Sequence, residues 1–139
     1  MKSSRLLFSI GAWSFLLLGV GHLATQLQLM RSPGPRPAVF EAMESFQAPV
    51  LGPPVDLLSL YYGFSLMMGI LLVAVGWLGL FFLKREADFP LRGRSLLVFY
   101  SALSLITLVL SLRFFFIVPV AFSLVCLVSF VAAWLFCGK

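Results

Sequence analysis

Charged side chains are scarce in this sequence. Lys, Arg, Asp and Glu make up only 11% of the 139 residues, whereas a soluble globular domain carries about 25%. Hydrophobic residues make up 61%. This balance excludes an ordinary soluble domain and indicates a membrane protein. The net charge of +5 does not call for a nucleic-acid partner, because the placement of basic residues beside a membrane explains it better.

Histidine and cysteine are also scarce, with one histidine and two cysteines. A closed zinc site takes four ligands, mostly Cys and His, so we expect no metal. Cys126 and Cys137 would lie about 16 Å apart on one helix and cannot bridge each other. No glycine-rich phosphate loop and no Ser-His-Asp order is present. The sequence therefore predicts no catalytic residue and no cofactor.

What the sequence does contain is a set of long uncharged segments. They are residues 6–30, 57–83, 95–112 and 114–138. Each is long enough for about one membrane-crossing helix. We predict an all-α, four-helix membrane bundle that forms one domain over residues 1–139. Its expected spans are 6–30, 55–83, 94–112 and 119–137, with an outer loop over 31–54.

Most of the basic residues fall on one side of these spans. On that side are Lys2, Arg5, Lys84, Arg85, Arg92, Arg94 and Lys139, and on the other are Arg31, Arg36 and Arg113. Because basic residues stay in the cytoplasm, both termini are expected there. We therefore predict a multi-pass protein of the bacterial inner membrane, in contact with membrane lipids.

The loop over residues 31–54 is rich in proline at both ends, which ends the neighbouring helices. Between the prolines, residues 38–47 contain good helix formers. Val39, Met43 and Phe46 fall on one face, with Phe40 beside them. We expect a short amphipathic helix that lies on the outer membrane surface or caps the bundle.

Small residues mark the helix faces that allow close packing. On the span 57–83, Gly63 falls on one face, and Gly69 and Gly76 fall on nearly the opposite face. On the first span, Gly11 and Gly19 share a face with His22 and Gln26. We predict that these five glycines pack against helices, and that the span 57–83 is central, with neighbours on both sides.

The third span carries a line of hydroxyl groups. These are Tyr100, Ser104, Thr107 and Ser111, at helical spacing. Bonds to carbonyls of the same helix and interior packing explain such a line best. A track for a polar ligand stays open as the alternative. Pro119 fits the first turn of the next helix.

Several polar residues are expected near the outer ends of the spans. They are His22, Gln26, Glu44, Asp56, Tyr62 and Arg113. Ionisable groups at membrane depth cost roughly 2.5–3.5 kcal/mol or more unless they are paired or hydrated. We therefore name these six as candidate ligand-binding residues, with Arg113 able to hold a carboxylate. The structural alternative is that Arg113 extends to lipid head groups and His22 is a neutral core residue.

The layout resembles a family of small four-span bacterial membrane proteins of uncharacterised role. The resemblance rests on Gly21-His22, on residues 42–46 and 60–66, and on Arg113 with the phenylalanines before Pro119. More distantly, the layout is similar to DoxX-type four-helix proteins, some of which are linked to quinone or thiol redox systems. Neither resemblance supplies a catalytic residue.

Three functions follow from these features as hypotheses. The leading one is a non-enzymatic membrane protein that binds a small ligand, a lipid, a partner membrane protein or a second copy of itself. The second is a membrane enzyme or redox accessory that acts on a quinone or lipid through His22 and the nearby acidic residues. The third is a small dimeric transporter. A pocket that reaches His22 would favour a ligand site or an enzyme. A flat, glycine-lined groove would favour a partner subunit, and a path across the membrane would favour transport.

Overall fold

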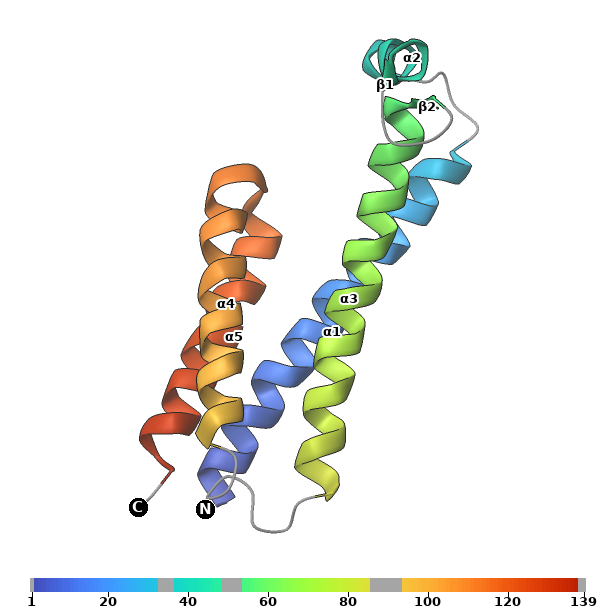
Figure 1. Ribbon diagram of the computed structural model, residues 1–139. Helices are drawn as coiled ribbons and strands as arrows, with labels where there is room; N and C mark the ends of the chain where they lie inside the picture. Colours follow the sequence, from blue (N-terminus) through green and yellow to red (C-terminus); the bar gives the residue numbers. More distant parts are fainter. Residues whose placement is uncertain (1, 33–36, 49–53, 86–93, 138–139) are drawn as a thin grey trace.

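Four long helices dominate the computed structural model, which describes residues 2–32, 37–48, 54–85 and 94–137 (Figure 1). The elements are α1 (Lys2–Arg31), α2 (Ala38–Ser45), β1 (Gln47–Ala48), β2 (Val55–Asp56), α3 (Leu57–Arg85), α4 (Arg94–Phe114) and α5 (Ile117–Leu135). Helices α1, α3, α4 and α5 are long and apolar enough to cross a membrane. The predicted all-α bundle is confirmed, and Pro119 lies in the first turn of α5 as expected.

Helix α1 occupies the centre of the bundle. It packs against α3 on one side and α5 on the other, and α4 packs on α5. The prediction that the span 57–83 is central is therefore wrong. Gly63 is exposed, and so are Ser59 and Ala74 on the same face of the helix. Helix α1 has close neighbours on both sides instead, because a Cβ added at Gly11 would meet Phe130 of α5 and one at Gly19 would meet Val73 of α3.

The backbones of α1 and α3 approach closely at their small residues. A Cβ added at Gly76 would lie 2.5 Å from the backbone nitrogen of Leu16. A Cβ at Gly19 would lie 2.7 Å from the backbone nitrogen of Val73, and one at Gly69 would overlap Leu23. These glycines therefore permit a helix contact that no larger residue would allow. Gly63 departs from its prediction, because a Cβ there would meet nothing within 4 Å.

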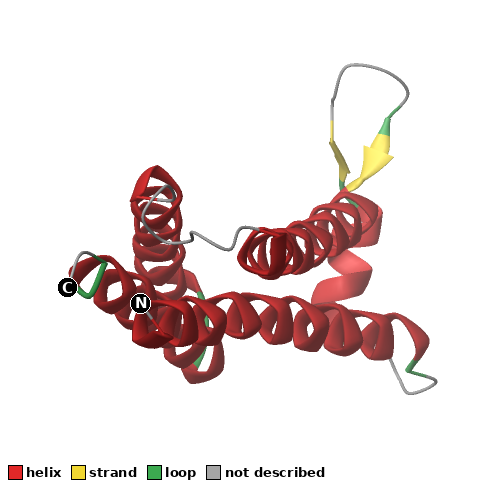
Figure 2. Cartoon of the chain, turned by 90° about the horizontal axis from the view of Figure 1, so that it is seen from below, coloured by secondary structure: helices red, strands yellow, loops and turns green. Residues whose placement is uncertain are grey.

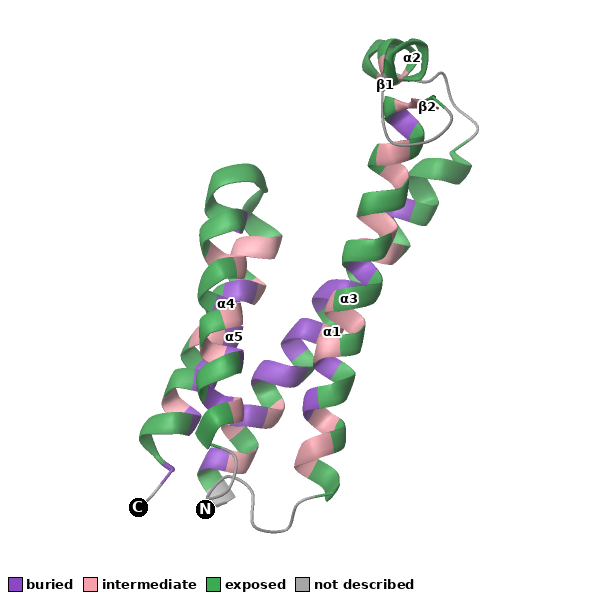
Figure 3. Cartoon of the chain, viewed as in Figure 1, coloured by how far each residue is buried: buried purple, intermediate pink, exposed green. Residues whose placement is uncertain are grey.

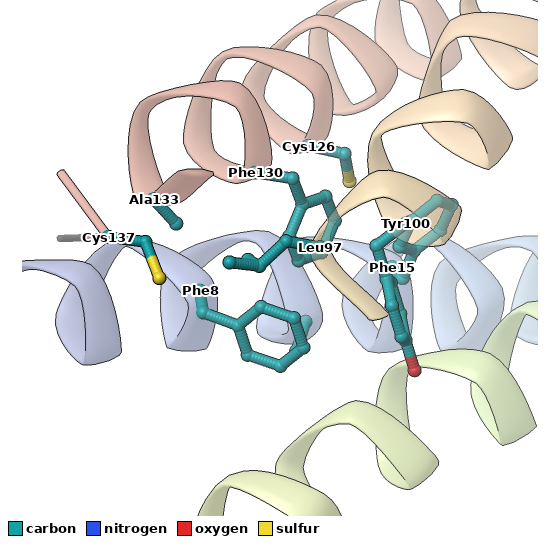
Figure 4. Packing of buried hydrophobic residues seen from close by; sticks show 9 residues of the cluster. Phe8, Phe15, Leu97, Tyr100, Cys126, Phe130, Ala133 and Cys137 are labelled. Carbon is teal, nitrogen blue, oxygen red and sulfur yellow. The ribbon is translucent and has the colours of Figure 1, made fainter. Parts of the chain in front are cut away.

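Four aromatic rings join α1, α4 and α5 (Figure 4). The Tyr100 ring centroid lies 4.9 Å from that of Phe130 and 5.2 Å from that of Phe8. Phe15 stacks on Phe130 at 6.0 Å. Gly11 leaves the space that the Phe130 ring fills. Aromatic pairs of this kind contribute about 0.5–1.5 kcal/mol each beyond their burial, so this cluster firmly joins the two halves of the molecule.

Polar contacts close the same end of the bundle. The Ser4 hydroxyl donates to the carbonyl of Ala133 at 3.1 Å. The Arg5 guanidinium donates to the Leu83 carbonyl in the last turn of α3, and that of Arg94 donates to the Cys137 carbonyl just after α5. Basic groups are favoured at helix C-termini, where carbonyls lack helical partners. We call this end of the molecule the closed end.

A small cap covers the opposite end of α3. Strands β1 and β2 pair antiparallel, with Gln47 opposite Asp56, and α2 lies over the start of α3 (Figure 1). In Figure 2 the strands lie at the far end of the α1–α3 pair, away from α4 and α5. The predicted amphipathic helix is present and caps α3 rather than the whole bundle. The strand pair was not predicted.

Burial is concentrated along α1, whereas α2 has no buried residue (Figure 3). Both cysteines are buried. The hydroxyl line of α4 behaves largely as its structural interpretation predicts. Ser104 donates to the Tyr100 carbonyl at 2.7 Å and Thr107 to the Leu103 carbonyl at 2.8 Å.

Candidate ligand-binding cleft

A cleft of about 610 Å³ lies between the α1–α3 pair and the α4–α5 pair. The two pairs approach each other at the closed end and diverge toward the other (Figure 1). The volume falls within the range of small-molecule sites, about 300–1,000 Å³. The cleft exists because α3 contacts α1 closely along its glycines, while no comparable contact draws α4 toward α3.

The floor of the cleft is formed where the Tyr100 side chain of α4 reaches α3. The Tyr100 hydroxyl donates to the carbonyl of Val75 at 2.7 Å, and Val75 and Phe15 both line the cleft. This hydrogen bond links the Tyr100 ring of the aromatic cluster to α3. It therefore marks the point at which the two helix pairs separate.

The walls are almost entirely apolar. The α1–α3 side presents Leu18, Phe64, Met67, Met68 and Leu71, and the facing side presents Leu103, Leu110, Phe114, Phe115 and Pro119. Methionine side chains are flexible and polarisable, so they adapt to ligands of different shape. The polar lining residues are His22, Thr107 and Ser111. Such a surface suits an apolar ligand with a small polar group.

His22 belongs to a short hydrogen-bond network between α1 and α3. Its Nε2 lies 3.0 Å from the Ser65 hydroxyl oxygen and 3.1 Å from the Ser65 carbonyl oxygen. The Ser65 hydroxyl donates to Oε1 of Gln26 at 3.0 Å. Gln26 is only 4% exposed, and its Nε2 has no hydrogen-bond partner among the described residues. Two of the six predicted residues, His22 and Gln26, are thus brought together at the cleft.

Thr107 and Ser111 face the cleft from α4, and their hydroxyls also make protein contacts. Thr107 bonds within α4, and the Ser111 hydroxyl oxygen lies 3.3 Å from that of Ser123 on α5. A hydroxyl that donates one hydrogen bond keeps a lone pair as an acceptor. These residues can therefore add weak polar contacts to a ligand without being unsatisfied when the cleft is empty.

Asp56 has a structural partner that accounts for both of its carboxylate oxygens. One oxygen accepts from the Ser59 backbone N–H and the other from the Ser59 hydroxyl, each at 2.7 Å. The carboxylate therefore caps the first turn of α3. The Ser59 hydroxyl, and after it the Ser59 N–H, lower the pKa of the Asp56 carboxyl below its usual value. Asp56 lies in the cap and does not line the cleft.

The remaining predicted residues lie apart from His22. Tyr62 packs edge-on against Phe40 of α2, at a centroid distance of 6.3 Å, and exposed Glu44 lies on α2. Arg113 is at the end of α4 on the other helix pair, and its guanidinium lies 5.8 Å from the Phe114 ring centroid. The sequence thus predicts one outer cluster, whereas the structure separates these residues into three places. His22 and Gln26 lie near the cleft, Asp56, Tyr62 and Glu44 lie at the cap, and Arg113 lies separately at the end of α4.

The sequence analysis missed Ser65 and the methionines Met67 and Met68 as site residues. Ser65 lies one turn before Gly69, on the face of α3 that packs on α1. Its pairing with His22 follows from the α1–α3 register, which one sequence does not reveal. No family model, curated protein or solved structure matches this chain.

Proposed function

We propose that this protein is a non-enzymatic membrane protein that binds a long-chain amphiphile in the cleft between its two helix pairs. The observation that carries the proposal is an apolar cleft of about 610 Å³ with one histidine in its lining. Large apolar side chains line the cleft and stay exposed, among them Phe64, Leu71 and Phe114. In a bilayer this surface faces lipid chains, so a ligand can enter from the side.

The proposal includes an orientation. The closed end carries Arg5, Lys84, Arg85 and Arg94, whereas Asp56 lies at the opposite end. With basic residues on the cytoplasmic side, both termini face the cytoplasm and the cleft widens toward the outer leaflet. A ligand in this position has its chain among the methionines and its polar group near His22.

Photochemical labelling tests this proposal. The purified protein in lipid nanodiscs is illuminated with a long-chain alcohol that carries a diazirine, and the labelled peptides are mapped by mass spectrometry. We expect label on α3 and α4 residues that line the cleft, and competition by the unlabelled alcohol. Label spread evenly over all lipid-facing residues, with no competition, would contradict a binding site.

Adjacent residues on α3 provide a matched pair of variants. Leu71 lines the cleft and is 56% exposed, while Ile70 is 59% exposed and is absent from the lining. Leu71→Trp places an indole in the cleft and should abolish labelling of the lining residues. Ile70→Trp adds the same side chain outside the cleft and should leave labelling as in the wild type. Equal labelling of both variants would refute the assignment of the cleft.

A further inference from the structure

The hydrogen bonds around His22 determine which ring nitrogen carries the proton. A backbone carbonyl oxygen only accepts hydrogen bonds, and the Ser65 carbonyl oxygen lies 3.1 Å from Nε2 of His22. In the neutral imidazole, Nε2 must therefore carry the hydrogen, since two lone pairs facing each other would repel. The same N–H then reaches the Ser65 hydroxyl oxygen at 3.0 Å.

The rest of the network agrees with this tautomer. Because the Ser65 hydroxyl oxygen accepts from His22, its own hydrogen is free to donate, and it donates to Oε1 of Gln26 at 3.0 Å. The Gln26 carbonyl thus ends the chain, and its buried Nε2 is left without a partner among the described residues. The hydrogen-bond chain thus runs from His22 to Ser65 to Gln26.

The other edge of the imidazole makes no hydrogen bond to Ser65, and His22 lines the cleft. Nε2 faces Ser65, and Cδ2 is packed near Gly69, where an added Cβ would lie 3.2 Å from it. Nδ1 is on the opposite side of the ring from that edge, and it has no hydrogen-bond partner in the described part of the chain. In this tautomer Nδ1 carries a lone pair and no hydrogen, so it is an acceptor.

We infer that the cleft selects an amphiphile whose polar group donates a hydrogen bond, such as a long-chain alcohol, over one whose polar group only accepts, such as an ether or ester. This inference rests on the proposed function, since it concerns the same cleft. It also has an energetic reason. A chain that moves from the bilayer into the cleft gains no hydrophobic free energy, because lipid is already apolar. Selectivity must then come from packing and from polar contacts, and among the polar lining residues only His22 offers an acceptor, Nδ1, with no hydrogen bond to the described part of the protein.

The single histidine of the chain makes the tautomer directly measurable. Protein labelled with ¹⁵N-histidine and purified through a tag without histidine gives signals from His22 alone. In a long-range ¹H–¹⁵N correlation spectrum we expect the Nε2–H pattern, and a shift of the Nδ1 resonance when hexadecanol is added. An Nδ1–H pattern would overturn the inference. Ser65→Ala keeps the backbone carbonyl, so the Nε2–H pattern should persist, and its loss would show that the hydroxyl had set the tautomer.

Binding is compared with two ligands of equal chain length, hexadecanol and hexadecyl methyl ether, as competitors of the diazirine alcohol. A hydrogen bond inside a membrane protein contributes about 0.6–1.7 kcal/mol, so the alcohol should compete about 3- to 18-fold better. His22→Phe removes the acceptor and should bring this ratio close to one. Thr25→Val removes an exposed hydroxyl of α1 that bonds only to the Gly21 carbonyl, and should leave the ratio unchanged.

The outcomes separate the two proposals. If neither ligand competes, the cleft does not bind such chains and the proposed function fails. If both compete equally in the wild type, or if the ether competes better, the function stands and the selection for a hydrogen-bond donor is refuted. A ratio that persists in His22→Phe would also refute it, since the discrimination would then arise elsewhere.

Discussion

The close approach of α1 and α3 at Gly76 predicts a large effect from a single methyl group. In Gly76→Ala the new Cβ would lie 2.5 Å from the Leu16 backbone nitrogen and 2.7 Å from the Ala12 carbonyl oxygen. Ordinary contact requires at least 3.4 Å. Both neighbours are backbone atoms, so no side-chain rotation relieves the overlap, and α1 must shift away by about 1 Å.

This shift would weaken the whole interface. A radial gap of about 0.5–1 Å forfeits a quarter to a half of each dispersion contact, and overpacked sites lose about 1–3 kcal/mol. Alanine is also the better helix former, by roughly 0.5–1 kcal/mol. Gly63→Ala isolates the packing effect, because it has the same propensity gain and a Cβ there meets nothing within 4 Å. Gly76→Ala should therefore be about 1–3 kcal/mol less stable than Gly63→Ala.

The two buried cysteines supply the assay. The thiols of Cys126 and Cys137 are buried, so a thiol-reactive fluorogenic dye should react with them only as the bundle opens. Thermal ramps of detergent-solubilised protein should place Gly63→Ala at or above the wild type and Gly76→Ala below both. If Gly76→Ala and Gly63→Ala melt at the same temperature, the close backbone contact of α1 and α3 does not exist, and the explanation of the cleft by this contact is refuted.

Three further results are expected. Tyr100→Phe loses the hydrogen bond to the Val75 carbonyl and should lower the free energy of unfolding by about 0.6 kcal/mol, up to roughly 1.7, in the same melting assay; no change would show that this bond does not join the helix pairs. Asp56→Ala removes the cap on Ser59 and should lower the melting temperature at neutral pH. Because the folded-state pKa of Asp56 is lowered, the ionised carboxylate stabilises the fold above the unfolded-state pKa. This stabilisation is lost as pH falls through the folded-state pKa. The melting temperatures of wild type and variant should therefore converge in acid. Fully buried Cys126 should react with a membrane-permeant maleimide, followed by mass spectrometry, only on unfolding, and rapid labelling of the folded protein would contradict the described core.

The four spans could be predicted because the thickness of a bilayer sets the length of an uncharged helix. The glycine positions were informative because small residues are needed wherever two helix backbones approach closely. They do not say which helix fills the space. Gly69 and Gly76 pack on α1 as expected, but Gly63 has the same residue type and no neighbour. The central position of α1 depends on how all four helices pair, which no single helix pattern contains.

The candidate site was predicted in part. A similar membrane depth predicts that residues are neighbours, and this holds for His22 and Gln26, which lie one turn apart on α1. It does not hold for Arg113, because depth leaves the lateral position of a helix undetermined. Asp56 carried a local signal, an acidic residue three positions before a serine at a helix start, and that pattern is typical of a cap. The cleft itself left no local signal, because it arises from the divergence of two helix pairs.

That divergence has a physical origin in helix length. Helices α1 and α3 contain 30 and 29 residues, and α4 and α5 contain 21 and 19. At 1.5 Å per residue the first pair is roughly 44 Å long and the second about 30 Å, close to the hydrocarbon core of a bilayer. A long pair shares a bilayer with a short one by tilting or protruding. Because both pairs are joined at the closed end, the tilt of α1 and α3 separates them from α4 and α5 toward the opposite end. Length mismatch therefore opens the cleft, and the glycine contact with α1 keeps α3 from closing it.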